Sequence, residues 1–221
     1  MDLKKEVAEY VTKFVNDGDV VGLGTGSTCK FFIEKLGQRV KEENLDILGV
    51  VTSYQAFFLA KELGIPITSL EEQDVDIAVD GADAIDPNLD IIKGGGASHT
   101  LEKIIDYSAK KFYVIADESK YFNNLSECAV PIEVIPIASR SVINTLTEIG
   151  ATPEIRIGVS KQGPVITDNG NFVIDAKFAD IPDPSSLEKD LNTIPGVVEN
   201  GLFTKNVDDV FISSKDGIKK L

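Results

Sequence analysis

The chain of 221 residues is 43% apolar and 26% charged, which is the composition of an ordinary soluble globular protein with one main core. It has 36 acidic and 22 basic residues, and the formal net charge of −14 argues against binding to nucleic acid or to an anionic membrane surface. No run of about 18 apolar residues and no apolar signal-peptide core are present, so we expect neither a membrane span nor a secretion signal. Cys29 and Cys128 are single and unclustered, which favours free thiols in a reducing cytoplasm over a zinc site.

The first half of the chain alternates predicted helices with predicted strands. Apolar residues recur at helical spacing from Leu3 to Val15 and stop at Asn16-Asp17-Gly18. The expected elements that follow are a strand at 20–23, a helix at about 28–43, a strand at 47–51, a helix capped by Ser53 that ends near Leu63, and a buried strand at 112–116. Repeated units of strand, loop and helix predict a parallel sheet with helices on both faces.

Two further apolar runs in this half end in charged residues and glycines. Residues 75–79 stop at Asp80-Gly81-Ala82-Asp83, and residues 89–92 stop at Lys93-Gly94-Gly95-Gly96. Both runs are typical of buried parallel strands that end in a loop. Because open α/β sheets bind ligands at the carboxyl ends of their strands, we expect these acids, the lysine and the glycines to converge on one crevice.

The pattern changes after about Ala129. The expected elements are a strand at 131–136, a helix at 139–149, strands at 154–159, 164–167 and 171–175, and a short helix at 184–191. Asp168-Asn169-Gly170 predicts a hairpin turn between two of these strands. The order β-α-β-β-α-β indicates a small α+β domain of the split-βαβ kind, and a last strand at 207–213 is expected to return to the large sheet.

The loop Gly24-Thr25-Gly26-Ser27-Thr28 lies between a predicted strand and a predicted helix. Glycines let backbone N–H groups approach an anion, and the helix N-terminus adds its positive dipole end. The alternative is a capped tight turn without a ligand, since Ser and Thr are ordinary N-caps. The spacing matches neither a dinucleotide fingerprint nor a P-loop, so a small phosphate ester is the better fit.

Asp80 and Asp83 can be an acid–base pair, metal ligands or turn formers. Their spacing matches no calcium loop and no other ligand cluster is present, so a metal is not expected. Lys93 and the glycines after it can present a cation and N–H donors to a developing oxyanion, although a glycine hinge is the alternative. Glu102, in the first turns of the next helix, is either a base or an exposed acid at a helix start.

The sole histidine, His99, is interpreted as structural or merely exposed, with substrate contact as the alternative, and Cys29 is interpreted as a packing residue. The remaining groups are a carboxylate, a lysine beside amide donors, an acid pair and a phosphate loop. These are the parts needed to abstract a proton next to the carbonyl of a sugar phosphate.

Four ordered motifs resemble type A ribose-5-phosphate isomerase. They are the 24–28 loop, Asp80–Asp83, Lys93–Gly96 with Glu102-Lys103, and Ala116-Asp117-Glu118-Ser119-Lys120, and the segment 195–203 is also similar. The resemblance implies interconversion of D-ribose 5-phosphate and D-ribulose 5-phosphate without metal or organic cofactor, in a cytoplasmic homodimer. It also implies a Rossmann-like catalytic domain, assigned to residues 1–128 and 201–221, and a small ferredoxin-like α+β domain at residues 129–200.

The resemblance also implies roles for individual residues. Glu102 matches the catalytic base. The positions that match substrate-binding segments are Lys4, Thr25, Gly26, Ser27, Thr28, Asp80, Gly81, Ala82, Asp83, Lys93, Gly94, Gly95, Gly96 and Lys120. The stretch Ala97-Ser98-His99-Thr100-Leu101 departs from the family, which often has a fourth glycine there, but the spacing from Lys93 to Glu102 is kept.

Two other functions are open on a related fold. A sugar-phosphate-sensing module would need a DNA-binding domain, which the charge of −14 disfavours. An amino-sugar-phosphate deaminase or a phosphogluconolactonase would be expected to place a histidine near the acids, whereas the only histidine is His99.

Overall fold

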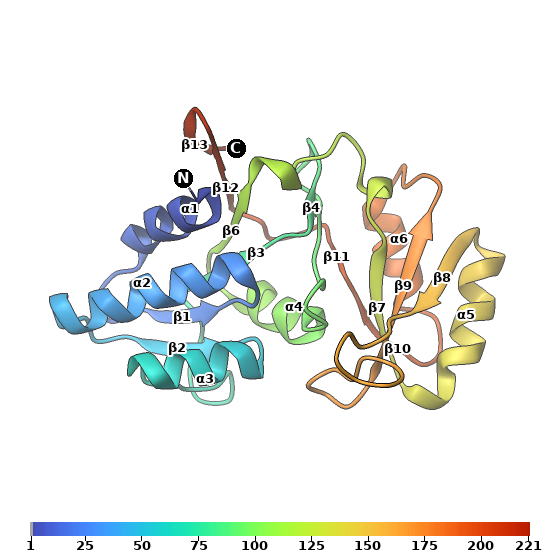
Figure 1. Ribbon diagram of the computed structural model, residues 1–221, viewed down its shortest axis with the longest axis horizontal. Helices are drawn as coiled ribbons and strands as arrows, with labels where there is room; N and C mark the ends of the chain where they lie inside the picture. Colours follow the sequence, from blue (N-terminus) through green and yellow to red (C-terminus); the bar gives the residue numbers. More distant parts are fainter. Residues whose placement is uncertain (1) are drawn as a thin grey trace. The chain divides into compact units, whose positions relative to one another are not determined.

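The computed structural model describes residues 2–221, which form two compact units. The first unit comprises the chain up to Ala82, Leu101–Lys120 and Lys205–Leu221. The second unit comprises Asp83–Thr100 and Tyr121–Thr204 (Figure 1). The chain therefore passes from one unit to the other four times.

A six-stranded sheet with the order β13-β12-β6-β3-β1-β2 organises the first unit. Its strands are β1 (Val20–Leu23), β2 (Leu48–Val51), β3 (Ile77–Gly81), β6 (Phe112–Asp117), β12 (Asp209–Ser214) and β13 (Gly217–Lys220). The first five run parallel to their neighbours, and β13 forms an antiparallel hairpin with β12. The predicted parallel sheet and the predicted return of the C-terminal segment are both confirmed.

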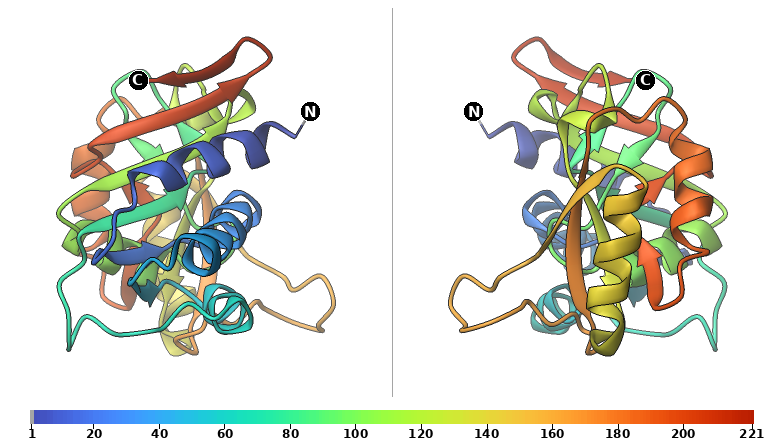
Figure 2. Two further views of the ribbon diagram at one scale, coloured as in Figure 1. Left: turned by 90° about the vertical axis from the view of Figure 1, so that its left-hand side faces the viewer. Right: turned by 90° about the vertical axis from the view of Figure 1, so that its right-hand side faces the viewer.

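The helices of this unit include α3, which has a cap at each end. They are α1 (Leu3–Val11), continued by a 3₁₀ turn at Thr12–Phe14, then α2 (Ser27–Glu43) and α3 (Tyr54–Leu63). Ser53 Oγ accepts the N–H of Ala56 at 3.2 Å, and Gly64 ends α3 with a φ of 79°. A core containing Val11, Phe32, Val79 and Phe211 joins α1 and α2 to the sheet, and Figure 2 shows α1 alongside β12.

The run 89–92 differs from its prediction as a strand of the main sheet. It forms β5 (Ile91–Ile92), which pairs antiparallel with β4 (Ala84–Ile85) and β11 (Leu202–Phe203) in a three-stranded sheet of the second unit. The physical reason is a tight turn before the strand, in which Asp86 Oδ1 accepts the N–H groups of Asn88 and Asp90 at 2.9 Å each. Leu89 takes a left-handed φ of 65° there, so a longer strand cannot form.

The main sheet of the second unit confirms the predicted β-α-β-β-α-β order. Its elements are β7 (Val130–Val134), α5 (Ser139–Glu148), β8 (Ala151–Ile155), β9 (Phe172–Phe178), α6 (Pro184–Leu191) and β10 (Val197–Asn200). The strands are antiparallel in the order β10-β7-β9-β8, which is the ferredoxin-like arrangement. A core containing Ile132, Val142, Ile174 and Leu191 joins both helices to this sheet.

The predicted strand at 164–167 is wrong, although the hairpin turn beside it is present. Thr167 N–H donates to Asn171 O at 2.9 Å across the turn. Before it, isolated bridges join Ile157 to Pro164 and Ile166 to Phe172, so the segment after β8 is a loop, which projects in both views of Figure 2. The apolar run is too short to make a strand of the sheet, and Ile166 within it is half exposed.

The compact units also differ in extent from the expected division of the chain. Residues 83–100 group with the second unit because β4 and β5 pair with β11. The chain enters the second unit again at Tyr121 and leaves it after Thr204. The expected boundaries of the small domain were residues 129 and 200. Helix α4 (His99–Ser108) begins in the second unit and continues into the first.

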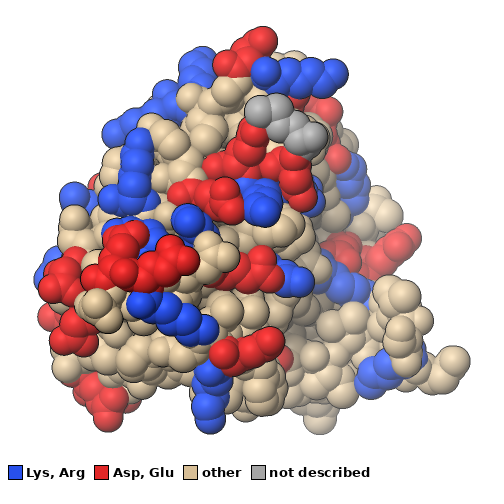
Figure 3. Space-filling model, turned by 60° about the vertical axis from the view of Figure 1, so that its left-hand side comes forward, with Lys and Arg blue, Asp and Glu red and all other residues tan. Residues whose placement is uncertain are grey.

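Acidic and basic side chains are interspersed on the face shown in Figure 3. Pairs one helical turn apart join Lys5 to Glu9 and Lys30 to Glu34 at 3.8 Å, and Arg39 to Glu43 at 2.8 Å. Such a mixed pattern is typical of a solvated surface. In the part of the chain that the structure describes, no helix combines the length and the apolar character needed to cross a bilayer.

Candidate functional site

The 24–28 loop connects β1 to α2 as predicted, and it lies directly against β3. Gly24 N–H donates to Val79 O at 3.1 Å, and Thr25 N–H donates to Asp80 Oδ1 at 3.2 Å. A Cβ at Gly24 would overlap Asp80 Oδ1 and lie 2.7 Å from Asp80 Cα. Glycine is therefore needed at this position because the two backbones approach so closely.

Lys4 reaches the same loop from α1. Its Nζ donates to Ser27 Oγ at 3.1 Å, in the first turn of α2. The positive end of the α2 dipole and the Lys4 ammonium thus act on one position. Lys4 therefore lies at the loop for which an anion site is expected.

Thr52 and Gln55, which the sequence did not indicate, and Ser53, predicted only as a helix cap, hold this loop in shape. Thr25 Oγ1 lies 2.7 Å from Thr52 Oγ1 and donates to Ser53 Oγ at 2.6 Å. Gly26 N–H donates to Gln55 Oε1 at 3.0 Å. The residues that follow β2 and open α3 therefore position the loop, and the only sequence signal for them was the Ser53 cap.

Asp80 is fully buried at the end of β3. Its Oδ1 accepts the N–H of Gly81 at 2.7 Å and the thiol of Cys29 at 3.2 Å, in addition to the N–H of Thr25. One carboxylate oxygen thus ties β3 to the 24–28 loop and to the first turn of α2. Cys29 has a structural contact here, in agreement with its interpretation from the sequence.

Lys120 lies in the 3₁₀ turn Glu118–Lys120 that follows β6. Burial opposes ionisation of Asp117, but hydrogen bonds from Ser119 and the charges of Lys4 and Lys120 hold the pKa of its carboxyl below the usual value. Lys4 and Lys120, both matched to substrate-binding segments, therefore act on the same carboxylate of the first unit. Their positive charge is concentrated locally in a chain whose overall charge is negative.

Glu102 lies in the first turn of α4 and is only 3% exposed. The alternative of a solvent-exposed helix-start acid is therefore wrong. Lys103 beside it is also buried, at 5% exposed. A buried carboxylate is costly unless it is bound by partners or used in chemistry, so its position is informative.

The glycine loop after Lys93 lies in the second unit together with Asp83. Gly95 N–H donates to Asp83 Oδ2 at 2.7 Å, and Gly94 has a left-handed φ of 108°. Lys93 is 2% exposed, and its Nζ lies 5.6 Å from the centre of the Phe203 ring. The glycine loop and Asp83 are thus in direct contact, and Lys93 immediately precedes that loop.

His99 is fully buried beneath this loop, with Nε2 3.3 Å from Glu199 O. A Cβ at Gly94 would lie 2.7 Å from His99 Nδ1, so the ring packs directly against the loop backbone. These contacts agree with the structural interpretation of His99.

The predicted site residues therefore form two groups, each described within its own unit. The first unit contains Lys4, Thr25–Thr28, Asp80–Ala82, Glu102 and Lys120, and the second contains Asp83 and Lys93–Gly96. Among residues 2–221, no group of three or more His, Cys, Asp or Glu side chains is placed to hold a metal ion.

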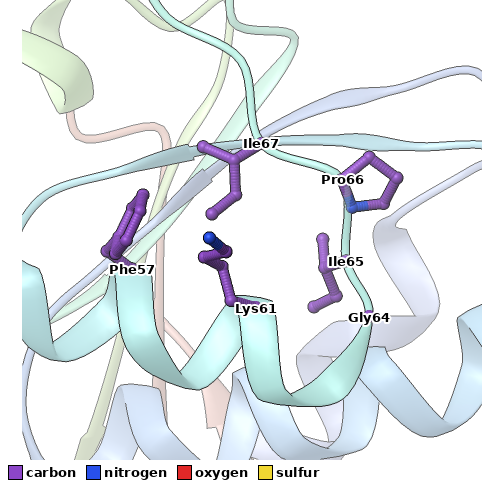
Figure 4. Close-up of a pocket in the computed structure, with 6 residues that line it drawn as sticks. All are labelled: Phe57, Lys61, Gly64, Ile65, Pro66 and Ile67. Atoms are coloured by element: carbon purple, nitrogen blue, oxygen red, sulfur yellow. The ribbon is translucent and has the colours of Figure 1, made fainter.

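A hollow of about 500 Å³ lies at the end of α3. Its lining consists of Phe57, Lys61, Gly64, Ile65, Pro66 and Ile67, as Figure 4 shows. None of these residues belongs to the predicted site. The hollow is open and mainly apolar, so it does not resemble a binding site for a phosphate ester.

Comparison with known proteins supports one family over the whole chain. The model of the family described as ribose 5-phosphate isomerase A (phosphoriboisomerase A) matches residues 48–217. Ribose-5-phosphate isomerase A of Methanothermobacter thermautotrophicus is 57% identical over 221 residues, which cover 100% of this chain and 98% of the relative.

Solved structures agree with this match. Ribose 5-phosphate isomerase A from Methanocaldococcus jannaschii superimposes with a TM-score of 0.97 at 53% identity, covering 100% of this chain and 98% of that one. A D-ribose-5-phosphate isomerase in complex with phospho-erythronic acid also gives a TM-score of 0.97 at 53% identity, with coverages of 100% and 97%. Together with the ordered motifs and the fold, these matches show that the chain belongs to the ribose 5-phosphate isomerase A family.

Proposed function

We propose that the chain is an aldose–ketose isomerase that interconverts D-ribose 5-phosphate and D-ribulose 5-phosphate in the non-oxidative branch of the pentose phosphate pathway. The observation that carries the proposal is the buried carboxylate of Glu102 in the first turn of α4, in a chain that matches this family over its full length. A buried carboxylate is less well solvated than one in water and so is a candidate for proton abstraction.

Glu102 is the proposed base. In the aldose-to-ketose direction, it removes the proton from C2 of the open-chain sugar. The C–H electron pair forms the C1–C2 double bond of an enediolate, and the carbonyl π electrons move to O1. A proton passes from O2 to O1, and the proton held by Glu102 is returned to C1, so that O2 becomes the ketone oxygen. No oxidant or external reductant is needed.

Lys93 and the glycine loop are proposed to stabilise the enediolate oxygens. Backbone N–H groups and a buried ammonium provide charge stabilisation without reorganising during the reaction. Gly95 N–H already donates to Asp83, so the loop and this acid act as one structural unit. Asp80 and Asp83 are proposed to serve ring opening and hydroxyl proton transfer.

The phosphate is proposed to bind at the start of α2. Thr25–Thr28 supply N–H and hydroxyl donors, and Lys4 and Lys120 supply the positive charge. The contact between Lys4 and Ser27 supports this assignment, because it places an ammonium at a helix N-terminus, where anions bind favourably.

An assay with ribose 5-phosphate as sole substrate tests the proposal, with ribulose 5-phosphate formation as the readout. Glu102→Gln should lose at least ~10²-fold in kcat with little change in KM, since general-base catalysis commonly contributes that much. Exchange of the substrate C2 hydrogen with solvent deuterium should disappear as well. Glu42→Gln, an exposed position at the end of α2, is the matched control.

Three results would contradict these assignments. Near wild-type kcat in Glu102→Gln would remove Glu102 from the mechanism. Binding without turnover by the wild-type chain would favour the sugar-phosphate sensor. Turnover of an amino-sugar phosphate or a sugar lactone in place of ribose 5-phosphate would favour a deaminase or a lactonase.

We also propose a cytoplasmic homodimer. The thiol of Cys29 donates to Asp80, a contact that requires reduced cysteine and so suits a reducing compartment. Ile157 and Val159 in the loop after β8 are 61% and 104% exposed, which supports a further contact surface. Light scattering on the purified chain should give twice the monomer mass, and a monomer mass would contradict the proposal.

A further inference from the structure

An arginine outside the predicted site holds the glycine loop in place. Arg156 follows β8, and its Nη1 donates to Gly94 O at 2.7 Å and to Gly95 O at 3.2 Å. On its other edge, Nε and Nη2 donate to the two carboxylate oxygens of Asp175 on β9, at 2.8 and 2.5 Å. The pair with Asp175 fixes the plane of the guanidinium, so that its remaining N–H groups point at the loop.

Arg156 and Asp83 bind the same peptide unit from opposite ends. The carbonyl of Gly94 accepts from Arg156, and the N–H of that peptide, carried by Gly95, donates to Asp83 Oδ2 at 2.7 Å. In a planar trans peptide, C=O and N–H point in opposite directions, so the unit links the two side chains. Hydrogen bonds in such a chain polarise one another, and the charges at both ends strengthen the effect.

The loop approaches Asp83 so closely that it accepts no side chain there. A Cβ at Gly95 would lie 2.7 Å from Asp83 Oδ1 and 3.0 Å from Oδ2. Asp83 is therefore held against the peptide backbone, and the orientation of that backbone determines where the carboxylate points. Arg156 acts on the same backbone through the carbonyls of Gly94 and Gly95.

We propose that Arg156 is a positioning residue for the isomerase reaction: it fixes the Gly94–Gly95 peptide and, through it, the carboxylate of Asp83. Asp175 orients the guanidinium. The inference rests on the proposed function insofar as Asp83 takes part in proton transfer. Displacement of a reacting group by about 1 Å can cost about 10²-fold in rate, so this contact affects kcat without touching substrate.

Lysine cannot replace arginine in this role. The guanidinium presents five donors in a planar fork, which here serves one carboxylate and two carbonyls at once. An ammonium group keeps the charge but cannot make the bidentate contact and reach both carbonyls. The order of activities is therefore wild type, then Arg156→Lys, then Arg156→Ala.

Steady-state kinetics on the full chain test the proposal. Arg156→Ala should lower kcat about 10- to 100-fold while KM changes less than about threefold. Guanidinium ion at millimolar concentration should restore part of the lost kcat in Arg156→Ala and should not restore activity in Glu102→Gln. Arg140→Ala, an exposed arginine on α5 in the same unit, is the matched control and should behave as the wild type.

A second measurement is independent of catalysis. Hydrogen exchange of the Gly95 amide, followed by NMR, should be faster in Arg156→Ala than in the wild type, because the peptide that donates to Asp83 loses its anchor. The Arg140→Ala variant should leave that exchange rate unchanged. If the wild type has no isomerase activity, the proposed function fails, and the exchange rate alone decides whether Arg156 positions the loop.

Unchanged kcat in a folded Arg156→Ala variant would overturn the proposal. The proposal would also be overturned if kcat fell but the Gly95 amide exchanged no faster and guanidinium ion restored no activity. The arginine would then act only on overall stability. If Arg156→Ala does not fold, Arg156→Lys carries the same kinetic and exchange tests, and wild-type behaviour of that variant would overturn the need for a planar fork.

Discussion

Thr100 donates its hydroxyl hydrogen to the carboxylate of Glu133, and Thr100 precedes the proposed base Glu102 by two residues on the same helix. Glu133 on β7 is fully buried and also accepts from Thr167 and Asn171 at 2.8 Å and from Asn169 at 3.1 Å. The first turn of α4 is thus bound to the hairpin turn through one carboxylate. Because four side chains donate to Glu133, a group that accepts several hydrogen bonds is needed at this position.

Replacement of Glu133 by glutamine should destabilise the protein. The amide –NH₂ would face groups that are themselves donors, which leaves buried polar groups unsatisfied at a cost of about 1–3 kcal/mol. Chemical denaturation at pH 7 measures this difference. Glu154→Gln, exposed on strand β8 of the same sheet, should leave stability within about 0.5 kcal/mol of the wild type.

The same carboxylate predicts a pH dependence of stability. Burial raises the pKa of Glu133, but the hydrogen bonds from Thr100, Asn171, Thr167 and Asn169 outweigh burial and bring the pKa below the ordinary value of 4.5. Its contribution is therefore complete above that value and is lost as the pH falls through the lower pKa of the folded state. The stability difference between wild type and Glu133→Gln should shrink from pH 7 to pH 3, and a constant difference would contradict this assignment.

Asp90 should show the opposite behaviour. Burial, together with the charges of Asp86, Glu188 and Asp183, raises the pKa of Asp90 to about 6. The folded state therefore disfavours the charged form, and stability is lost as the pH rises from the unfolded value near 4 through 6. Asp90→Asn should raise the Tm at pH 7.5. The gain in free energy of unfolding should be no more than about 1 kcal/mol after allowance for solvent screening, and it should be smaller at pH 4. An Asp74→Asn control, at an exposed position, should show no such trend.

Lys4→Ala should weaken phosphate recognition specifically. A hydrogen bond to a charged group contributes about 1.5–3 kcal/mol, so KM for ribose 5-phosphate should rise about 10-fold or more. Binding of unphosphorylated ribose should stay unchanged. Lys5→Ala removes an equal charge from the same turn, where Lys5 pairs with Glu9, and it should alter KM much less. Equal losses for both sugars would show that Lys4 only shapes the loop.

Gly24→Ala should disturb the phosphate loop through a steric clash. The added Cβ would overlap the Asp80 carboxylate and press against its Cα, and overpacking of this kind costs about 1–3 kcal/mol. Both Tm and phosphate affinity should fall. Gly18→Ala is the comparison variant. Its new Cβ would meet no other atoms, but Gly18 has a left-handed φ of 85°, so this variant should lower the Tm without changing KM. Loss of phosphate affinity in Gly18→Ala as well would indicate a general effect of stability.

The sequence predicted those features that depend on neighbouring residues. The cap at Ser53, the end of β3 at Asp80-Gly81 and the turn at 168–170 follow from local chemistry, and the structure contains all three. The order of strands and helices also predicted both sheets. The family motifs pointed to residues of which some are in contact within a unit, such as Thr25 with Asp80 and Gly95 with Asp83.

The features that escaped prediction depend on partners distant in the sequence. Arg156 stands between two isoleucines, and nothing near it indicates that it meets Gly94 and Asp175. The same holds for Glu133, whose donors come from a helix start and from a hairpin turn. The run 89–92 was assigned to the wrong sheet because its pairing with β11 is a contact across more than a hundred residues.

The four passages of the chain between the units restrict how the protein can be cut. The shortest fragment with both segments of the second unit, residues 83–204, also contains β6, whose hydrogen-bonded neighbours β3 and β12 belong to the removed parts. All six residues of β6 are buried, so its two bare edges and apolar faces would make this fragment prone to aggregate. Neither unit is therefore separable by simple truncation of the chain.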